Sequence, residues 1–240
     1  MGLYFMKSQK KTAKDYVQDG LVAMWDGIEN AGWGQHADNP DVFVDLLGND
    51  SIGKYGNSVS SVYPTWFSED ALCARPYLNG QRSSVLYDAL VGGNVTVELV
   101  ATRESLSGST VGFPAIMTAN NWLNFAGFIG ARLLVYNRGA AQYVDGFPDT
   151  APYSFSMTLS VDGDGVMYVY KDGIYFATVN PGAASRPSNS NFSIGLNLNL
   201  VNNSSYYALL THCVRIYSRS LTAAAVSANS AIDKVRFNLP

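Results

Sequence analysis

Apolar and polar residues alternate with a period of two along several stretches of this chain. In residues 154–161, apolar side chains from Phe155 to Val161 alternate with Ser or Thr, and stretches 95–102 and 192–200 show a similar alternation. Successive side chains of a strand point to opposite faces of its sheet. One face of each stretch is therefore expected to lie on a core and the other in water or under a neighbour, which predicts antiparallel sheets.

Turn-forming residues separate these stretches. The sequence DGDG at 162–165 and the sequence DG at 172–173 predict tight hairpins, because Asp and Gly tolerate the positive φ that such turns require. Together they predict a three-stranded meander over about residues 153–179. Further strands are predicted at 21–25, 71–78, 125–136 and 207–217, with a loop rich in Pro, Ser and Asn at 181–191.

The C-terminal stretch 212–237 predicts a strand followed by a short helix. Thr222 can begin the helix, because its hydroxyl can accept a backbone N–H bond from the first turn. Strong helix formers follow over residues 223–231, with Val226 on the face that packs inward. We expect this helix to close one edge of a two-sheet sandwich.

Three further residues of this stretch are expected to have structural roles. Phe237 is expected to anchor the chain after the helix by apolar contact, and Arg215 and Arg219 are interpreted as turn and edge contacts. None of the three is assigned to a ligand.

Composition favours a single large β domain. Hydrophobic residues make up 47% of the 240 residues and charged residues 15%, which is ample for one core. We predict an N-terminal basic arm over residues 1–14 and one domain over residues 15–240. The net charge of −3 and the pI near 5.3 argue against nucleic acid as a partner, since nucleic-acid binders usually carry a basic face.

The sequence also bears on location and on the two cysteines. No cleavable leader is recognised at the N-terminus, and no apolar run approaches the length of a membrane span, so no membrane partner is expected. Residence in the cytoplasm, or release to a virion or extracellular setting by lysis, is consistent with this. Cys73 and Cys213 each lie in an apolar run, and the sequence leaves open whether they are free or bridged.

Several stretches that resemble catalytic or metal-binding motifs lack residues that those motifs require. The sequence GNDSIGKY at 48–55 nearly matches a phosphate-binding loop, but Tyr55 stands where Ser or Thr should bind magnesium. No cofactor is predicted. Calcium is conceivable at the DGDG turn, although no ligand set is recognised there. No strand shows acidic residues at alternate positions, and Glu98 is alone on its strand face, so a glycoside hydrolase is the least favoured function.

Two aromatic and amide-rich segments are candidates for glycan binding. Aromatic rings can stack on sugar rings while amides and imidazoles bond to hydroxyls, which is the usual chemistry of such sites. The alternative is that these side chains pack at loop bases and cap turns. The candidates are Trp33, His36, Asn120, Asn121, Trp122 and Asn124.

The blocks 19–32, 43–50, 169–174 and 212–237 together resemble the laminin G-like branch of the concanavalin A-like lectin/glucanase superfamily, in its bacterial and phage type. The resemblance extends over about residues 15–237 in spaced blocks. It implies a two-sheet jelly roll, and members of the superfamily serve as glycan-binding modules, adhesion domains, enzymes and virion parts. Ala225 and Ser230 depart from the pattern, so looser docking of the helix is expected. The positions that fit are Arg215, Ile216, Tyr217, Arg219, Leu221, Thr222, Asn229, Asp233 and Phe237.

Two functional hypotheses remain in front. The first is a non-catalytic recognition or attachment module that binds a glycan or a protein, displayed on a cell or virion surface. The second is a structural virion component, such as a head decoration or fibre protein, which docks through its N-terminal arm on other virion proteins or on copies of itself. The docking candidates are Lys7, Lys10, Lys11 and Lys14.

Overall fold

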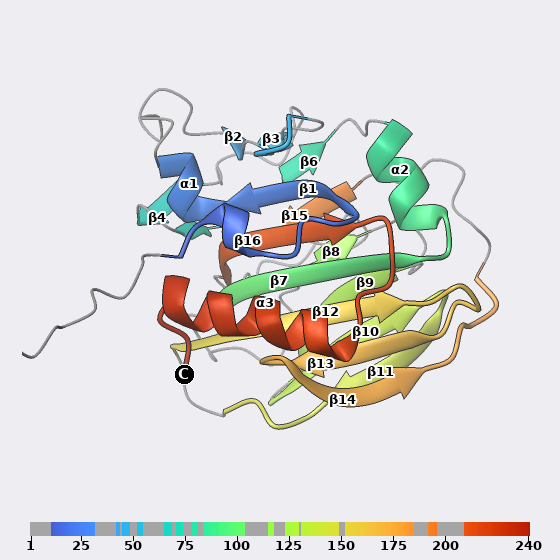
Figure 1. Cartoon of the computed structure of the whole chain (residues 1–240). Coiled ribbons are helices and arrows are strands. Elements are labelled where there is room, and N and C mark those ends of the chain that lie inside the picture. The colour runs from blue at the N-terminus through green and yellow to red at the C-terminus, as the bar shows by residue number, and fades with distance from the viewer. Residues whose placement is uncertain are drawn as a thin grey trace, which may run out of the picture.

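A computed structural model shows two antiparallel sheets packed face to face, with a helix across the outside of one of them (Figure 1). This confirms the predicted two-sheet antiparallel sandwich with a C-terminal helix. The structure describes residues 11–31, 42–43, 45–48, 52–54, 65–68, 71–73, 78–80, 84–103, 115–117, 123–129, 131–148, 152–184, 192–195 and 209–240.

The first sheet, called sheet A, contains the three longest strands of the described residues. β7 (Val95–Arg103) lies between β12 (Tyr153–Val161) and β16 (Leu209–Tyr217). The sheet continues beyond β12 through β13 (Met167–Lys171) to β14 (Ile174–Val179). On the other side of β7, β16 pairs with β5 (Ala71–Cys73), β5 pairs with β4 (Thr65–Ser68), and β1 (Leu21–Asp26) also pairs with β16.

The second sheet, called sheet B, is formed partly of very short strands. Its strand order in the described residues is β11, β10, β9, β8, β15, β6, β3 and β2. The bounds are β11 (Ala140–Val144), β10 (Arg132–Asn137), β9 (Leu123–Ile129), β8 (Ala115–Met117), β15 (Phe192–Gly195), β6 (Leu78–Gly80), β3 (Ile52–Lys54) and β2 (Val42–Phe43).

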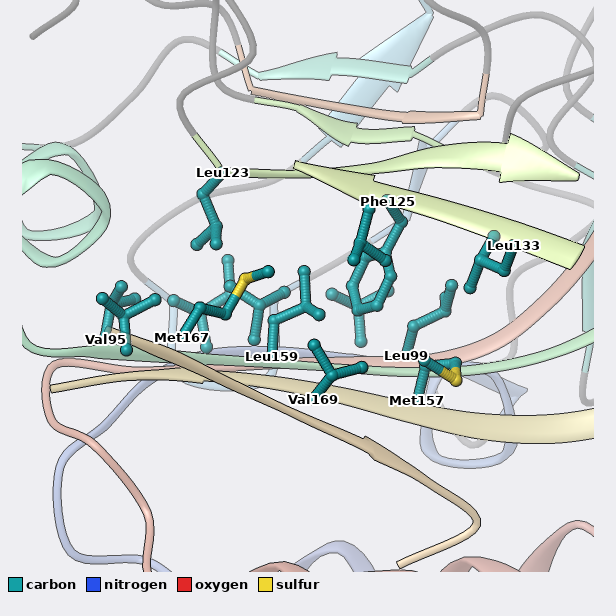
Figure 2. Close-up of a cluster of buried hydrophobic side chains, with 14 of the residues drawn as sticks. Val95, Leu99, Leu123, Phe125, Leu133, Met157, Leu159, Met167 and Val169 are labelled. Carbon is teal, nitrogen blue, oxygen red and sulfur yellow. The ribbon is translucent and has the colours of Figure 1, made fainter. Parts of the chain in front are cut away.

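The apolar halves of the alternating stretches meet between the two sheets. Leu99 on β7 and Met157 and Leu159 on β12 point toward Phe125 and Leu133 of sheet B (Figure 2). All five side chains are buried. Removing this apolar area from water, at about 25 cal/mol per Å², is the main driving force for joining the sheets. The period-two pattern therefore identified the inward residues of β7 and β12 correctly.

The strand predictions are confirmed in the meander, at 21–25 (β1) and, within the described residues, at 207–217 (β16), but two other predicted strands each combine two separate strands. The predicted strands at 153–179 are β12, β13 and β14. The single strand predicted at 71–78 is wrong, because β5 lies in sheet A whereas β6, from Leu78, lies in sheet B. The stretch 125–136 likewise divides into β9 and β10, which pair as antiparallel neighbours.

Asp172 and Gly173 form the tight turn between β13 and β14, both with positive φ, of 51° and 80°. Gly173 is required for a second reason. A Cβ atom built on it would lie 2.7 Å from the Cβ of Ser230, which belongs to the C-terminal helix. The hairpin tip thus packs so closely under the helix that a side chain at this position would force one of them to shift.

Three α-helices and one 3-10 turn occur among the described residues. The short elements are η1 (Ala13–Asp15) and α1 (Gly27–Ala31), and α2 (Ser84–Val91) buries Leu86 and Leu90 in the core. Neither α1 nor α2 was predicted from the sequence. No helix among the described residues is long and apolar enough to cross a membrane.

The C-terminal helix, α3 (Ala223–Arg236), begins where the sequence predicts. The Thr222 hydroxyl accepts the Ala225 N–H at 3.3 Å, and Val226 is fully buried. The helix continues to Arg236, beyond the predicted end at residue 231. The expected position was wrong, because α3 lies across the outer face of sheet A and does not close an edge (Figure 1).

Candidate functional site

The outer face of sheet A is polar and is covered by α3. Thr96 and Glu98 on β7 share this face with Ser156, Thr158 and Ser160 on β12, and all five side chains are buried. The hydroxyls are hydrogen-bonded in pairs, including Thr96 Oγ1 with Ser160 Oγ at 3.0 Å and Ser156 Oγ with Ser230 Oγ of α3 at 3.3 Å. Ser230 therefore contributes a hydrogen bond at the position where the resemblance implied looser docking.

Arg215 is the centre of a buried charge network beneath α3. Its Nε donates to Glu98 Oε2 at 2.7 Å, and its Nη1 and Nη2 donate to the two carboxylate oxygens of Asp233, each at 2.7 Å. The side chain is 1% exposed. The interpretation of Arg215 as a turn or edge contact was therefore wrong.

The first described segment of the chain closes this network. The Tyr16 hydroxyl donates to Asp233 Oδ1 at 2.7 Å, and the Tyr16 ring centre lies 3.9 Å from Cζ of Arg215. The Val17 N–H donates to Asn229 Oδ1 at 3.0 Å, while Asn229 Nδ2 donates to Glu98 Oε2 at 2.9 Å. Residues 16–17 and helix α3 are thus held to sheet A by one shared set of polar contacts.

A second charged contact fixes the C-terminal end of α3. Arg236 donates from Nη1 to Asp26 Oδ2 at 2.5 Å and from Nη2 to Glu29 Oε1 at 3.3 Å. Glu29 Oε1 also accepts the Ala13 N–H at 3.2 Å. The last helix, α1 and the N-terminal 3-10 turn are joined at this point.

Burial controls the protonation of these groups. Burial raises the pKa of Glu98, although the nearby Arg215 opposes the shift. Burial also works against the charged form of Arg215, but the carboxylates of Asp233 and Glu98 hold its pKa above the ordinary value. Burial raises the pKa of the Cys213 thiol well above its ordinary value. The network is shielded from solvent and internally paired, which suits a structural role.

Strand β14 carries more exposed large apolar side chains than any other described element. Its residues Ile174–Thr178 are called the β14 edge. Ile174, Tyr175 and Phe176 are 72%, 53% and 38% exposed. The Tyr175 ring is held in place by an edge-on contact with Tyr170, at 5.9 Å between ring centres, and by a 2.8 Å hydrogen bond between its hydroxyl and Thr178 Oγ1. A rigid strand thus presents aromatic and aliphatic groups to solvent.

The predicted glycan-binding residues fall largely outside the described part of the chain. Trp33, His36, Asn120, Asn121 and Trp122 lie outside the described residues, and they stay predictions. Asn124 lies in β9, where its backbone is opposite Tyr136 of β10.

The described residues beside these two segments are far apart in the fold. Residue 33 follows α1, which joins the end of β1 at Asp26, and residue 122 precedes Leu123, which packs beside α2 and the start of β7. Figure 1 places α1 and α2 at opposite ends of the sandwich. The structure does not bring the bases of the two predicted segments together.

The lysines of the predicted arm are only partly described. Lys7 and Lys10 lie outside the described residues, whereas Lys11 pairs with Asp15 at 3.4 Å. Lys14 is exposed within the 3-10 turn.

His212, Phe237 and Arg219 make contacts within the fold. His212 is buried, with Nε2 at 2.8 Å from Thr102 Oγ1, and its ring centre is 5.5 Å from that of Phe237, which is buried as predicted. His36 lies outside the described residues. Arg219 pairs with the exposed Asp19, which agrees with its interpretation as a turn contact.

The DGDG motif is a hairpin turn, and the phosphate-like motif is only partly described. In the sequence GNDSIGKY, residues 52–54 form the strand β3, whereas residues 49–51 and 55 lie outside the described residues. At the DGDG turn, Asp162 Oδ1 accepts the N–H groups of Asp164 and Val166 at 3.0 and 2.9 Å, as expected of a hairpin. Within the described ranges, no group of His, Cys, Asp or Glu side chains is placed to hold a metal ion. Cys213 is a free, buried thiol.

Sequence reasoning missed both the charge network and the β14 edge. The network joins residues far apart in the chain, and only their outward positions on β7 and β16 could have indicated it. The edge did leave a signal, because the sequence IYFATV at 174–179 lacks the period-two alternation of its neighbours.

With this geometry in view, comparison with solved structures shows that the chain shares a β-sandwich fold with known proteins. No protein-family model and no curated sequence matches it. Among solved structures, Trypanosoma rangeli sialidase in complex with 2,3-difluoro-KDN is similar, with 15% identity and a TM-score of 0.60 over 90% of this chain and 33% of that one.

Two botulinum neurotoxin structures are also similar to it. The binding domain of botulinum neurotoxin DC, in complex with rat synaptotagmin II, gives a TM-score of 0.62 and 12% identity over 91% of this chain and 52% of that one. A structure of botulinum neurotoxin type C, described with its interaction with two ganglioside molecules, gives 0.61 and 11% over 88% and 51%. The chain thus spans between a third and about half of these proteins, and the likeness shows the fold.

Proposed function

We propose that this protein is a non-catalytic recognition module that binds a glycan or a protein partner through an exposed surface of the sandwich. The observation that carries the proposal is the β14 edge. Exposed clusters of large apolar side chains usually mark interaction sites. Here they stand on a paired strand, and the Tyr175 ring is fixed by Tyr170 and Thr178. A fixed ring loses little conformational entropy on binding, which favours affinity.

The buried carboxylates support a non-catalytic role. A glycoside hydrolase of the usual kind needs two carboxyl groups facing one groove. In the described residues, Glu98 and Asp233 bind Arg215, and Asp26 binds Arg236. These groups hold α3 against sheet A and are shielded from substrate by it.

The similar structures support the choice of partner class. They include a domain in complex with synaptotagmin and a toxin described with gangliosides, and this chain covers about half of each of them. Display on a cell or virion surface, and membership of the laminin G-like branch, belong to the same proposal. Both rest on the sequence resemblance and on the sandwich with its C-terminal helix.

A second candidate is a structural virion component that docks through residues 1–14. The observation in its favour is that the residues at the end of this segment, and directly after it, are held firmly in the fold. Tyr16 is buried under α3, and Ala13 donates to Glu29, so a force on the preceding lysines would be carried into the domain. Deletion of residues 1–10 tests this candidate without removing the Tyr16 contact. Loss of co-assembly with purified virion proteins would support it, and unchanged co-assembly would contradict it.

The first proposal is tested with the purified chain on a glycan array and on a panel of receptor ectodomains. The variant Ile174→Ser/Tyr175→Ser should lose at least tenfold in affinity for any partner found. The matched control Val85→Ser/Val235→Ser removes two apolar side chains that are exposed on α2 and α3. Equal affinities of both variants would reject the β14 edge as the binding surface. Release of the dye from fluorogenic glycosides at a rate above that of heat-inactivated protein would reject the non-catalytic role.

A further inference from the structure

The backbone of β14 indicates which class of partner the β14 edge would bind. β14 is the last strand on its side of sheet A and pairs with β13 alone among the described strands. An edge strand has N–H and C=O groups on its outer side that only another extended chain can satisfy in a regular ladder. The occupant that matches such a strand along its length is therefore an extended polypeptide.

The side chains of β14 lack the usual protections of an edge. Natural edge strands carry charged side chains, proline, a bulge or an inward-pointing charge that prevents pairing with other chains. The sequence IYFATV at 174–179 contains no charge, no proline and no glycine. One bulge at Phe176 interrupts the ladder with β13, but it leaves the Phe176 side chain exposed.

The neighbouring edge of sheet B, at β11, differs from the β14 edge in having charged side chains beside it. β11 lies beside β14 and presents Tyr143, which is covered on one side by the guanidinium of Arg132, at 4.9 Å from Cζ to the ring centre. Arg132 in turn lies 3.9 Å from Asp145. Charged groups thus occupy the β11 edge, and the uncharged surface is confined to β14.

Charge also permits two copies of β14 to meet. The charges nearest the strand are Lys171 and Asp172, which pair with each other at 3.3 Å at the hairpin tip. The strand β14 itself carries no charge. In a two-fold antiparallel pairing centred between Phe176 and Ala177, Ile174 would face Val179 of the other copy and Tyr175 would face Thr178. No like charges are brought together, and aromatic and β-branched side chains face one another, which favours cross-strand pairing.

We propose that the β14 edge pairs with the β14 edge of a second copy, joining two sheets A across a two-fold axis. The inference rests on the proposed function, because it assigns a partner to the same surface. A two-fold contact needs only one patch, which both copies supply.

Sedimentation velocity of the full chain tests the pairing. An edge contact of this size is small, so we expect a dimer, of twice the 26.0 kDa chain mass, to form reversibly at concentrations of about 1–200 µM. The variant Ile174→Lys/Tyr175→Lys should raise the dimer dissociation constant at least tenfold, because two charges would face the partner strand. Val85→Lys/Val235→Lys is the matched control and should leave it within twofold.

Two results would overturn the pairing. One is a monomeric wild-type chain throughout this range, and the other is a dimer that Ile174→Lys/Tyr175→Lys leaves intact. Circular dichroism establishes that each variant is folded, and Ile174→Lys alone provides a milder variant, since this side chain is the most exposed of the large apolar residues described.

The same variants separate this inference from the proposed function. If the chain is monomeric and the variants lose binding to a glycan or a receptor, the recognition surface stands and self-pairing fails. If the chain dimerises through β14 and binds no glycan or receptor, self-pairing stands and recognition of a foreign partner fails.

Discussion

Removal of the Asp233 carboxylate is expected to be among the most damaging single changes to this fold. In Asp233→Ala, Arg215 loses two hydrogen bonds of 2.7 Å and Tyr16 loses its hydroxyl acceptor. The guanidinium remains buried with Glu98 as its one carboxylate partner. Breaking one side of a buried ion pair typically costs about 3–5 kcal/mol, because the remaining charge stays desolvated.

The expected loss is measurable by equilibrium urea unfolding at pH 7, followed by far-ultraviolet circular dichroism and tryptophan fluorescence. The matched control is Asp19→Ala, which removes the partner of Arg219 at a site where Asp19 is 77% exposed. Exposed ion pairs contribute at most about 1 kcal/mol, so this change should scarcely move the midpoint. A loss in Asp233→Ala no larger than that in Asp19→Ala would refute the assignment of the network as a structural element.

Three other changes test separate parts of the fold. Because burial raises the pKa of Glu98 above 4.5, its contribution to stability is fully present below pH 4.5 and is lost as pH rises through the folded-state pKa. The free energy of unfolding of the wild type relative to Glu98→Gln should therefore fall between pH 4 and pH 8, and a constant difference would contradict this. The thiol of Cys213 should resist iodoacetamide at pH 8 in the folded chain and react in urea, as peptide mass spectrometry can show; labelling of the folded chain would contradict its burial. Gly173→Ala should destabilise by about 1 kcal/mol or more beyond Gly48→Ala, since both have positive φ but only Gly173 meets α3; equal losses in thermal unfolding would contradict the close packing.

The sequence predicted the features of the fold that depend on local patterns. The alternation at 154–161 identified both faces of β12, and the Asp-Gly pair at 172–173 identified its hairpin because only certain residues tolerate positive φ there. Thr222 marked the start of α3 through its capping hydroxyl. Each of these signals is carried by a few neighbouring residues.

Features that depend on long-range contacts were not predicted. Helix α2 has the sequence SVLYDALV, whose mostly apolar residues give little amphipathic contrast. The strands at 71–73 and 78–80 belong to different sheets, and no local pattern in the sequence separates them. The network joins Tyr16, Glu98, Arg215 and Asp233, which meet only when both chain ends pack on sheet A.

Binding by the purified chain, with and without the β14 edge, tests the central claim most directly. The measurement is the equilibrium affinity for a partner from the glycan and receptor panels, by biolayer interferometry, for the wild type, Ile174→Ser/Tyr175→Ser and Val85→Ser/Val235→Ser. Recognition through the β14 edge predicts at least a tenfold loss for the first variant and less than a twofold change for the second. Equal affinity of all three proteins, or no binding by the wild type to any member of either panel, would contradict it.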